Sequence, residues 1–389
     1  MSTLKVNTIR HTGASSDAVT LATDGTCTAK ITNNLSNRNL IINGAMQVAQ
    51  RGTSSTGHGM ECIDRWNHYR EGVEENPVFV QSDVASGTAP YQKGFRKTFK
   101  VINGNQTSGA GGDDYITVDH KIEAQDIANS GWDYTSTSSY ITLSFWVKSS
   151  VAQIFYGYLK SQDGTAKSYP FSTGSLSADT WTKVTKTIPG VSGLQFDNDN
   201  GHGLQLRFLP FRGVNKTDPG VTLDAWGNWN NTARVPDISN TWYNTNDATF
   251  EITGVQLEVG EHATDFEHRS YGDELARCHR YYYKHIAGNN LVVCLGFSSA
   301  TNQVSGYIQF PTTMRATPSI DHTSGDNYYR LGAGNLGGDK YVDGAWALQG
   351  ATDQSTRIYA TPQSTLTAGE PGLVDTTSAS ASMAFSAEL

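Results

Sequence analysis

The chain has 389 residues, of which 37% are apolar and 17% charged, and its net charge is -8 with a pI near 5.7. This length is sufficient for two or three domains with separate cores. Low charge together with abundant Gly, Ser, Thr and Asn favours turn-rich β-structure over helical bundles. The acidic balance, without any block of Lys or Arg, argues against a nucleic-acid surface.

Neither a membrane span nor a signal peptide is indicated. No apolar run approaches the roughly 20 residues that a span needs, and the first residues lack the apolar core of a signal peptide. The four cysteines are Cys27, Cys62, Cys278 and Cys294, and none of them forms a CxxC pair. We therefore expect buried thiols in place of a zinc site or a disulfide framework.

The first 36 residues contain three short β-prone pieces at 4–9, 18–22 and 26–32, with Asp24 and Gly25 as a hairpin signal. So few residues cannot bury a core alone. This predicts that the segment leans on another chain, either copies of itself or a docking partner. A disordered leader is the alternative, since chain termini are commonly loose.

A longer half-buried strand is predicted next. Leu40, Ile42, Met46 and Val48 share one parity, and Gly44 between them indicates a close backbone approach. Further strands are predicted at 95–101, 115–118, 141–147, 153–159, 180–188 and 204–208, with a helical turn or two within 121–128. Many short strands at turn-punctuated spacing predict an all-β fold, a jelly-roll β-sandwich.

Residues 249–283 close this sandwich and lead out of it. The apolar alternation slips phase between Ile252 and Val255, so a β-bulge is expected at Gly254. Ser270 is then predicted to cap a helix that extends to about Lys284. Its apolar stripe consists of Tyr271, Leu275, Cys278 and Tyr282. The stripe suits a coiled-coil seam or packing within the protomer, and the shortness of the helix favours packing.

A second, smaller β-sandwich domain is predicted after the helix. Leu291, Val293, Leu295 and Phe297 alternate with their neighbours, and so do Val304, Ile308 and Phe310. The alternation at 379–389 continues to Leu389, which predicts a last strand within a sheet.

Motifs for catalysis are absent from the sequence. It contains no Gly-x-Ser-x-Gly, no HExxH and no phosphate-binding glycine loop. Glycoside cleavage needs two carboxyl groups about 5 to 10 Å apart. Glu71, Glu74, Glu75, Asp113 and Asp114 are available, but we interpret acids so placed as solvated turn residues. The prediction is a protein that is not an enzyme.

No metal or other cofactor is predicted. Residues 197–201 imitate the start of a calcium loop, yet the bidentate Glu that should follow is missing, and a turn explains them as well. The ten histidines include no HxH or HxxxH pair.

Aromatic residues give the candidate binding site. Exposed rings beside amides and carboxylates suit sugar recognition, because rings stack on apolar sugar faces and polar groups fix hydroxyls. The alternative is that the rings pin a long polar loop, residues 211–247, to its own sandwich. The candidate carbohydrate-binding residues are Trp226, Trp229, Trp242, Tyr243, Tyr328 and Tyr329.

Several motifs resemble bacteriophage tail fibre proteins. They are the leader KVNTIRHTGASSDAVTLATDGTCTA, the segment NLIINGAMQVAQRGT with Ile63-Asp-Arg-Trp66, the junction FEHRSYGDELARCHRYYYK and IQFPTTMRATPS. Residues 38–268 also resemble jelly-roll carbohydrate-binding modules, in which the first and last strands lie side by side. The matching pieces are NLIING, YITLSFWVKSS, Trp181-Thr-Lys-Val-Thr, GLQLRF and FEITGVQLEVG.

The resemblance implies a virion structural protein, a homotrimeric tail fibre assembled in the bacterial cytoplasm. Its implied parts are a tail-attachment segment (1–36), a carbohydrate-binding-like jelly roll (37–268), a linking helix (269–285) and a C-terminal β-domain as candidate receptor-binding tip (286–389). Its implied partners are copies of itself, tail proteins and a host-surface glycan, with no nucleic acid and no membrane insertion. A free-standing carbohydrate-binding protein and a polysaccharide-degrading tailspike remain alternatives, although no β-helix repeat is present.

Overall fold

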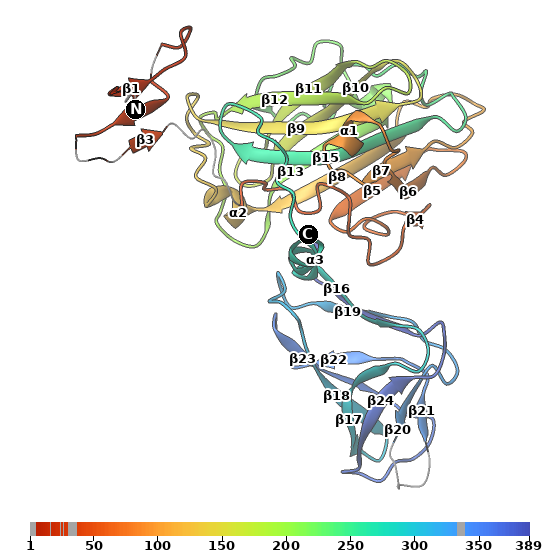
Figure 1. Cartoon of the computed structure of the whole chain (residues 1–389). Coiled ribbons are helices and arrows are strands. Elements are labelled where there is room, and N and C mark those ends of the chain that lie inside the picture. Colours follow the sequence, from red (N-terminus) through yellow and green to blue (C-terminus); the bar gives the residue numbers. More distant parts are fainter. Residues whose placement is uncertain (1–4, 16, 24, 26, 30–36, 333–338) are drawn as a thin grey trace.

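The computed structural model describes residues 5–15, 17–23, 25, 27–29, 37–332 and 339–389. Figure 1 shows a large β-sandwich, a smaller β-unit joined to it through helix α3, and a small sheet near the N-terminus that stands apart from both. The chain is thus mostly β-structure, as predicted. Among the described residues no helix is long and apolar enough to cross a membrane.

One layer of the sandwich, here called the front sheet, has six antiparallel strands. In spatial order they are β14 (Gly227–Asn228), β11 (Lys167–Ser175), β10 (Ile154–Ser161), β13 (His202–Arg212), β8 (Tyr115–Glu123) and β5 (Trp66–Glu71). Short helix α2 (Ala124–Ala128) continues directly from β8, inside the predicted helical stretch.

The other layer, the back sheet, also has six antiparallel strands. In spatial order they are β12 (Thr182–Pro189), β9 (Tyr140–Ser149), β15 (Thr249–Val259), β7 (Lys97–Ile102), β6 (Val78–Asp83) and β4 (Ser54–Ser55). Helix α1 (Ala89–Gln92) lies between β6 and β7 in sequence, and the 3₁₀ turn η1 (Val214–Lys216) follows β13.

The core of the sandwich lies between the two sheets. Phe145 of the back sheet meets Phe208 of the front sheet edge to face, with ring centroids 4.9 Å apart. Both rings are buried, as the period-two alternation of their strands requires. Every predicted strand between 95 and 208 has a counterpart in the two sheets, so the predicted jelly-roll sandwich is confirmed.

The predicted strand at 40–48 is wrong, because this segment forms turns without regular ladder pairing. Asn43 and Met46 have φ near +58°, which breaks an extended strand. The segment still lies beside β15, since the amide of Leu40 bonds to the carbonyl of Leu257. A Cβ on Gly44 would come 2.1 Å from the carbonyl oxygen of Val255, so the predicted close approach is confirmed.

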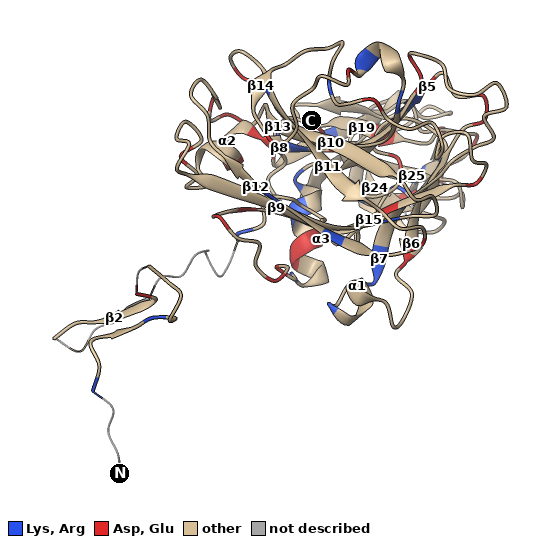
Figure 2. Ribbon diagram, turned by 90° about the horizontal axis from the view of Figure 1, so that it is seen from above, with Lys and Arg blue, Asp and Glu red and all other residues tan. Residues whose placement is uncertain are grey.

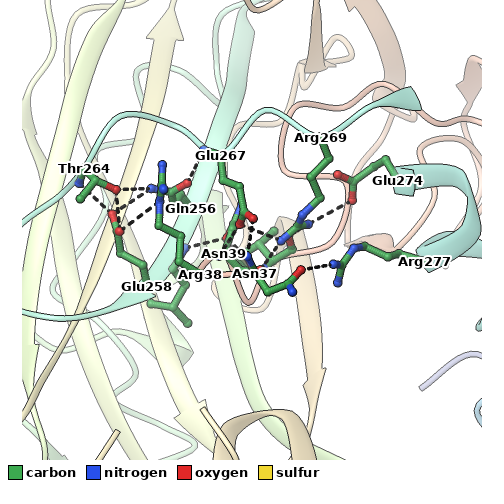
Figure 3. A network of polar contacts seen from close by, with 12 residues as sticks. Asn37, Arg38, Asn39, Gln256, Glu258, Thr264, Glu267, Arg269, Glu274 and Arg277 are labelled. Carbon is green, nitrogen blue, oxygen red and sulfur yellow. Dashed lines mark hydrogen bonds and ion pairs between the residues drawn. The ribbon is translucent and has the colours of Figure 1, made fainter. Parts of the chain in front are cut away.

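A polar network fastens this opening segment to the end of the sandwich (Figure 3). The Glu267 carboxylate accepts the backbone N–H groups of Asn37 and Asn39 at 2.6 and 2.8 Å. Arg269 in turn bonds to the carbonyl of Asn39 and pairs with Glu274. Side chains therefore supply the attachment that a β-ladder would otherwise provide.

The predicted bulge and helix cap are both confirmed. The register of β15 against β9 shifts between Thr253 and Gln256, and Gly254 there has φ +61°. The Ser270 hydroxyl accepts the amide of Asp273 and so caps α3 (Tyr271–His279). The predicted extent of this helix is wrong, because Tyr282 begins strand β16. Aromatic residues favour strands, and this tail pairs with β25.

The C-terminal unit contains a three-stranded and a seven-stranded sheet. The first consists of β16 (Tyr282–Ala287), β25 (Ser382–Ser386) and β19 (Ser319–His322). The second consists of β21 (Lys340–Val342), β20 (Tyr329–Gly332), β24 (Pro371–Thr376), β17 (Val292–Ala300), β18 (Gln303–Gln309), β23 (Ser355–Ala360) and β22 (Ala347–Gln349). Residues of both sheets form one core, separate from that of the sandwich.

The leader forms a small sheet of β1 (Thr8–Ile9), β2 (Val19–Leu21) and β3 (Cys27–Ala29). The predicted pieces thus contain strands, although residues 4, 26 and 30–32 of them lie outside the described part. Among residues 5–15, 17–23 and 25 of the leader none belongs to either core, and Ile9 is 56% exposed. Figure 2 shows this sheet clear of the rest of the protein.

Ion pairs and rings join the sandwich to the C-terminal unit, at what we call the joint. Arg65, fully buried, pairs with Glu388 at 2.5 Å and lies over the Tyr281 ring at 3.4 Å. Arg280 makes two bonds of 2.7 Å to the Glu123 carboxylate, which also accepts the hydroxyl of Tyr281. Each of these carboxylates therefore meets a guanidinium from the other side.

Candidate functional site

A groove of about 490 Å³ lies over the outer face of the front sheet. We call it the front groove. Its lining combines aromatic rings, amides and basic side chains, and contains no Asp or Glu among the described residues. The lining residues are Tyr69, Tyr115, Lys121, Tyr158, Lys160, Gln162, His202, Gln205, Arg207, Arg212, Trp229, Asn231 and Arg234.

Strand alternation places these side chains on one face. In β13, Leu204 and Leu206 enter the core, so Gln205 and Arg207 point away from it. The register then builds two rows across neighbouring strands. One row is Tyr158, Arg207 and Asp119, and the other is Lys160, Gln205 and Lys121. Adjacent strands lie only about 4.8 Å apart, so each row is closely spaced on a rigid floor.

Trp229 forms a wall of the front groove. It comes from the long loop after β13, which is tied down where the Trp229 amide bonds to the carbonyl of Ala166 at 2.8 Å. Its ring lies 5.2 Å from that of Tyr158. The ammonium of Lys160 stands 4.4 Å from the same ring, and the guanidinium of Arg234 stands 5.3 Å from it. The ring is thus held in place while part of it stays accessible.

Arg207 is the one groove cation with a close carboxylate partner among the described residues. It pairs with buried Asp119 at 3.0 Å, and Gln205 donates to the other oxygen of Asp119 at 2.9 Å. Burial is the largest single influence and works against the charged guanidinium, but the Asp119 carboxylate and the Tyr158 side chain together raise the pKa of Arg207. Arg207 therefore stays charged.

Lys160, Arg212 and Arg234 have no ion pair with any described carboxylate. Arg212 is only 5% exposed and rests 4.5 Å from the Tyr115 ring. Burial and then the positive charge of Arg234 lower the pKa of Arg212 to about 10. The guanidinium Nε of Arg212 has no hydrogen-bond partner within the described part of the chain. Charge without a counter-charge thus collects in this groove.

The pKa of His202 is lowered in part by the same cluster of positive charges. Burial, followed by the charges of Lys121 and Lys160, lowers the pKa of His202 to about 3. Its Nε2 is buried and lacks a hydrogen-bond partner among the residues described. Lys121 is held by the main-chain oxygen of Leu389 at 2.6 Å, and burial lowers its pKa.

Three of the candidate carbohydrate-binding residues are buried, and two of these, Trp242 and Tyr243, belong to the long loop. Trp242 and Tyr243 are 0% and 1% exposed, so neither ring can stack on a sugar. Trp242 bonds through Nε1 to the carbonyl of Thr249, and Tyr243 donates to buried Asp114. These rings pin the long loop to the sandwich, because an ordered loop of that length needs such packing. Asp114 is correspondingly a structural acceptor rather than a solvated turn residue.

The other candidate carbohydrate-binding residues differ in burial and in their position relative to the front groove. Trp226 is half-buried and bonds through Nε1 to the carbonyl of Pro189 at 2.7 Å, outside the front groove. Tyr329 is fully buried in the C-terminal unit, which rules out its predicted role as an exposed ring. Tyr328 beside it is half-buried. Trp229 is the one candidate that lies in the groove, and its role in binding remains a prediction.

The remaining groove residues were missed by the sequence reasoning. Their signal lay in the polar parity of strands identified by their apolar parity. Residues 115–123 (YITVDHKIE) and 154–161 (IFYGYLKS) carry rings and cations at the positions that face away from the core. Comparing those positions between strands could have indicated a basic aromatic face.

Metal-ligand clusters are not found in the part of the chain that the structure describes. Residues 197–201 form the turn before β13, where Gly201 donates its amide to Asp199. Of the four cysteines, Cys62 and Cys278 are buried as expected, whereas Cys294 is half-buried.

No protein-family model and no curated protein sequence matches this chain. Solved structures do match. An enzymatically active domain of tailspike protein 4 from bacteriophage CBA120 is 10% identical with a TM-score of 0.29, over 57% of this chain but only 21% of that one. A putative sugar-binding protein from Bacteroides thetaiotaomicron is 12% identical over 57% of this chain and 99% of its own, with a TM-score of 0.30.

A family 11 carbohydrate-binding module from Clostridium thermocellum, solved with a mixed-linked tetrasaccharide, is 12% identical with a TM-score of 0.25. The match covers 53% of this chain and 95% of that module. At such identities these likenesses concern the sandwich fold alone, and the chain spans about a fifth of the tailspike chain.

Proposed function

We propose that this protein binds a glycan in the front groove. The observation that carries the proposal is the groove itself, where accessible rings and polar side chains stand together on a rigid sheet. Trp229 and Tyr69 offer apolar faces, and Gln162 and Asn231 offer amides for hydroxyl groups. Sugars need both kinds of contact, and neither kind alone would fix an orientation.

A substitution series tests glycan binding at this place. Trp229→Ala should abolish or strongly weaken retention of the protein on immobilised host-surface polysaccharide. Trp181→Ala is the matched control, because Trp181 is a similarly half-buried ring of the sandwich that contributes nothing to the front groove. Equal retention of both variants and the parent protein would contradict the proposed site.

The protein is further proposed to be a bacteriophage tail fibre, located in the virion tail and assembled in the host cytoplasm. In this role residues 1–36 attach to tail proteins and the β-domains face the host surface. The sequence motifs support it, and so do leader residues 5–15, 17–23 and 25, none of which belongs to either core. Deleting residues 1–36 should leave glycan binding intact while abolishing incorporation into tails.

A homotrimer completes the proposal. The outer face of the seven-stranded sheet exposes a row of large apolar side chains, with Leu295 78% exposed and Tyr307 59% exposed. Leu373 lies directly across from Leu295 on β24 and is 43% exposed. Such a row suits contact between copies of the chain.

Mass in solution, by sedimentation or light scattering, tests the oligomer. The expected mass is about three times that of the 42.2 kDa chain. Leu295→Glu should shift the assembly toward monomer, whereas Lys183→Glu, at an exposed position of the sandwich, should not. A parent protein that is monomeric at all concentrations would favour a free-standing carbohydrate-binding protein.

We propose binding without cleavage. Glycoside hydrolysis requires two carboxyl groups about 5 to 10 Å apart at the bond, and the described lining of the groove offers neither. Incubation with bound polysaccharide should leave its chain length unchanged. Shortened products would move the proposal to a polysaccharide-degrading tailspike.

A further inference from the structure

The charge of the front groove runs opposite to the charge of the protein. The whole chain carries -8, whereas five of the groove's lining side chains are Lys or Arg and none is Asp or Glu among those described. Chance placement on an acidic protein would intersperse both signs. Figure 2 shows that elsewhere on the ribbon acidic and basic residues are indeed mixed.

The fold supplies an anionic or main-chain partner for two of these five cations and leaves Lys160, Arg212 and Arg234 without a described carboxylate. Arg207 has its carboxylate, Asp119, and Lys121 has the main-chain oxygen of Leu389. Lys160 and Arg212 meet aromatic rings instead, at 4.4 and 4.5 Å, and have no acid beside them in the described chain. Clustered like charges lower the stability of the folded protein. An unpaired set on one face therefore indicates that a bound ligand supplies the counter-charge.

A buried guanidinium donor and a buried imidazole nitrogen in the same groove also lack hydrogen-bond partners among the described residues. Arg212 is 5% exposed, and neither its Nε nor Nε2 of His202 has a partner among the described residues. Unsatisfied buried polar groups are costly, and native proteins retain few of them without a reason. An incoming anionic group would supply acceptors and counter-charge together.

We propose that the front groove selects acidic polysaccharides, whose carboxylate, sulfate or phosphate groups meet Lys160, Arg212 and Arg234 while Trp229 stacks on a sugar ring. This inference rests on the proposed glycan-binding function and adds the charge of the ligand to it. A neutral glycan would leave the cations uncompensated, and discrimination against it follows from that cost.

Nucleic acid is the competing polyanion. The observations favour a polysaccharide because the cluster of basic residues without acids is limited to the groove lining. The chain as a whole carries -8, and that net charge repels an extended phosphate backbone. The test therefore includes a nucleic acid as a separate ligand.

Calorimetric titration of the full chain distinguishes these possibilities. The ligands are polygalacturonate and dextran sulfate as acidic polysaccharides, dextran and a mixed-linked glucan as neutral ones, and oligothymidylate as nucleic acid. The acidic polysaccharides should bind more tightly than the neutral ones, with affinity falling as salt rises. A preference for polygalacturonate over dextran sulfate, or the reverse, identifies the acidic group.

Charge removal in the groove supplies the second arm. The double variant Lys160→Gln with Arg234→Gln should lose roughly tenfold or more in affinity for the acidic ligand, the loss expected for deleting charge-assisted hydrogen bonds. The matched control, Lys100→Gln with Lys183→Gln, removes the same charge from the back sheet and should bind normally.

Each remaining result overturns the inference in a distinguishable way. Equal binding of neutral and acidic polysaccharides, unaffected by the double variant but lost in Trp229→Ala, would refute charge selection and leave the glycan function standing. Binding of oligothymidylate as tight as that of polygalacturonate would refute a polysaccharide site. Absence of binding to every polysaccharide would remove the proposed function as well.

Discussion

The joint and the front groove both contain buried or half-buried arginines, but these arginines have different partners in the two regions. At the joint Arg65 and Arg280 each meet a carboxylate, Glu388 and Glu123 respectively. In the groove Arg212 and Arg234 meet aromatic rings and no described carboxylate. Arginines that are paired with a carboxylate of the chain thus hold the two units together. Arginines without such a carboxylate are available to a ligand.

Removing a carboxylate from the joint should have the largest effect. Glu388→Ala leaves Arg65 buried without its acid, and an uncompensated buried charge costs about 3 kcal/mol or more. Urea unfolding followed by tryptophan fluorescence measures the loss. Asp83→Ala is the control, because the exposed pair that it breaks with Lys97 is worth at most about 1 kcal/mol. Similar losses in both variants would mean that Arg65 finds another partner.

Neutralising the second carboxylate without changing its shape should cost less. Glu123→Gln keeps a hydrogen-bonding group opposite Arg280 and Tyr281 but removes the charge that strengthens both contacts. We expect a loss of about 1.5 to 3 kcal/mol in the same unfolding experiment. Tyr281→Phe, which deletes one neutral donor, should cost less than Glu123→Gln, and the opposite order would contradict this account of the joint.

Acid should weaken the sandwich through its histidines. The folded-state pKa of His202 is lowered to about 3 from an ordinary 6.5, so between these values the unfolded chain binds more protons. The neutral, buried His202 therefore costs no stability above pH 6.5. The free energy of unfolding decreases as the pH falls from 6.5 toward 3, by about 1 kcal/mol between pH 7 and 5.5. The melting temperature of His202→Asn should therefore fall less on acidification than that of the parent protein.

Asp64 has the opposite effect on the pH dependence of stability. Burial raises its folded-state pKa to about 6 from 3.8, despite hydrogen bonds from Gln50. Its protonation therefore stabilises the fold as pH falls from 6 toward 3.8. A double comparison with Asp64→Asn separates the two residues, since that variant should steepen the acid loss.

Removing a groove cation should have the smallest effect on stability. Lys160→Gln breaks no described ion pair and relieves repulsion from Arg207 and Arg234, so the free energy of unfolding should change by no more than about 0.5 kcal/mol. A loss of several kcal/mol would mean that the groove cations hold the fold together, and the contrast with the joint would fail.

Local patterns in the sequence were sufficient for much of the fold. Alternation identified the strands, the phase slip at Gly254 identified the bulge, and Ser270 identified the start of α3, because each depends on neighbours in the chain. The segment at 40–48 alternates like a strand, yet Asn39 and Glu267 fasten it by contacts more than 200 residues apart in sequence. Such contacts override local propensity.

The candidate site depended on distant contacts even more. Trp229 and Trp242 look alike in sequence, in one polar loop, but one ring reaches the groove and the other is buried beneath the loop. The basic residues of the groove come from separate strands and become neighbours only through the register of β8, β13 and β10. The pairing register between strands that are distant in sequence cannot be predicted from any one segment of the sequence.

Strand β8 connects the two contrasted regions directly. Glu123 at its end holds the joint. Two positions earlier Lys121 lines the groove, and four positions earlier buried Asp119 holds the groove residue Arg207. Tension between the sandwich and the C-terminal unit would therefore pull along this strand, which is bonded to β13 and β5 on both sides and loads them in shear. Force applied between the two units would therefore pass through the strand that carries Lys121 of the groove.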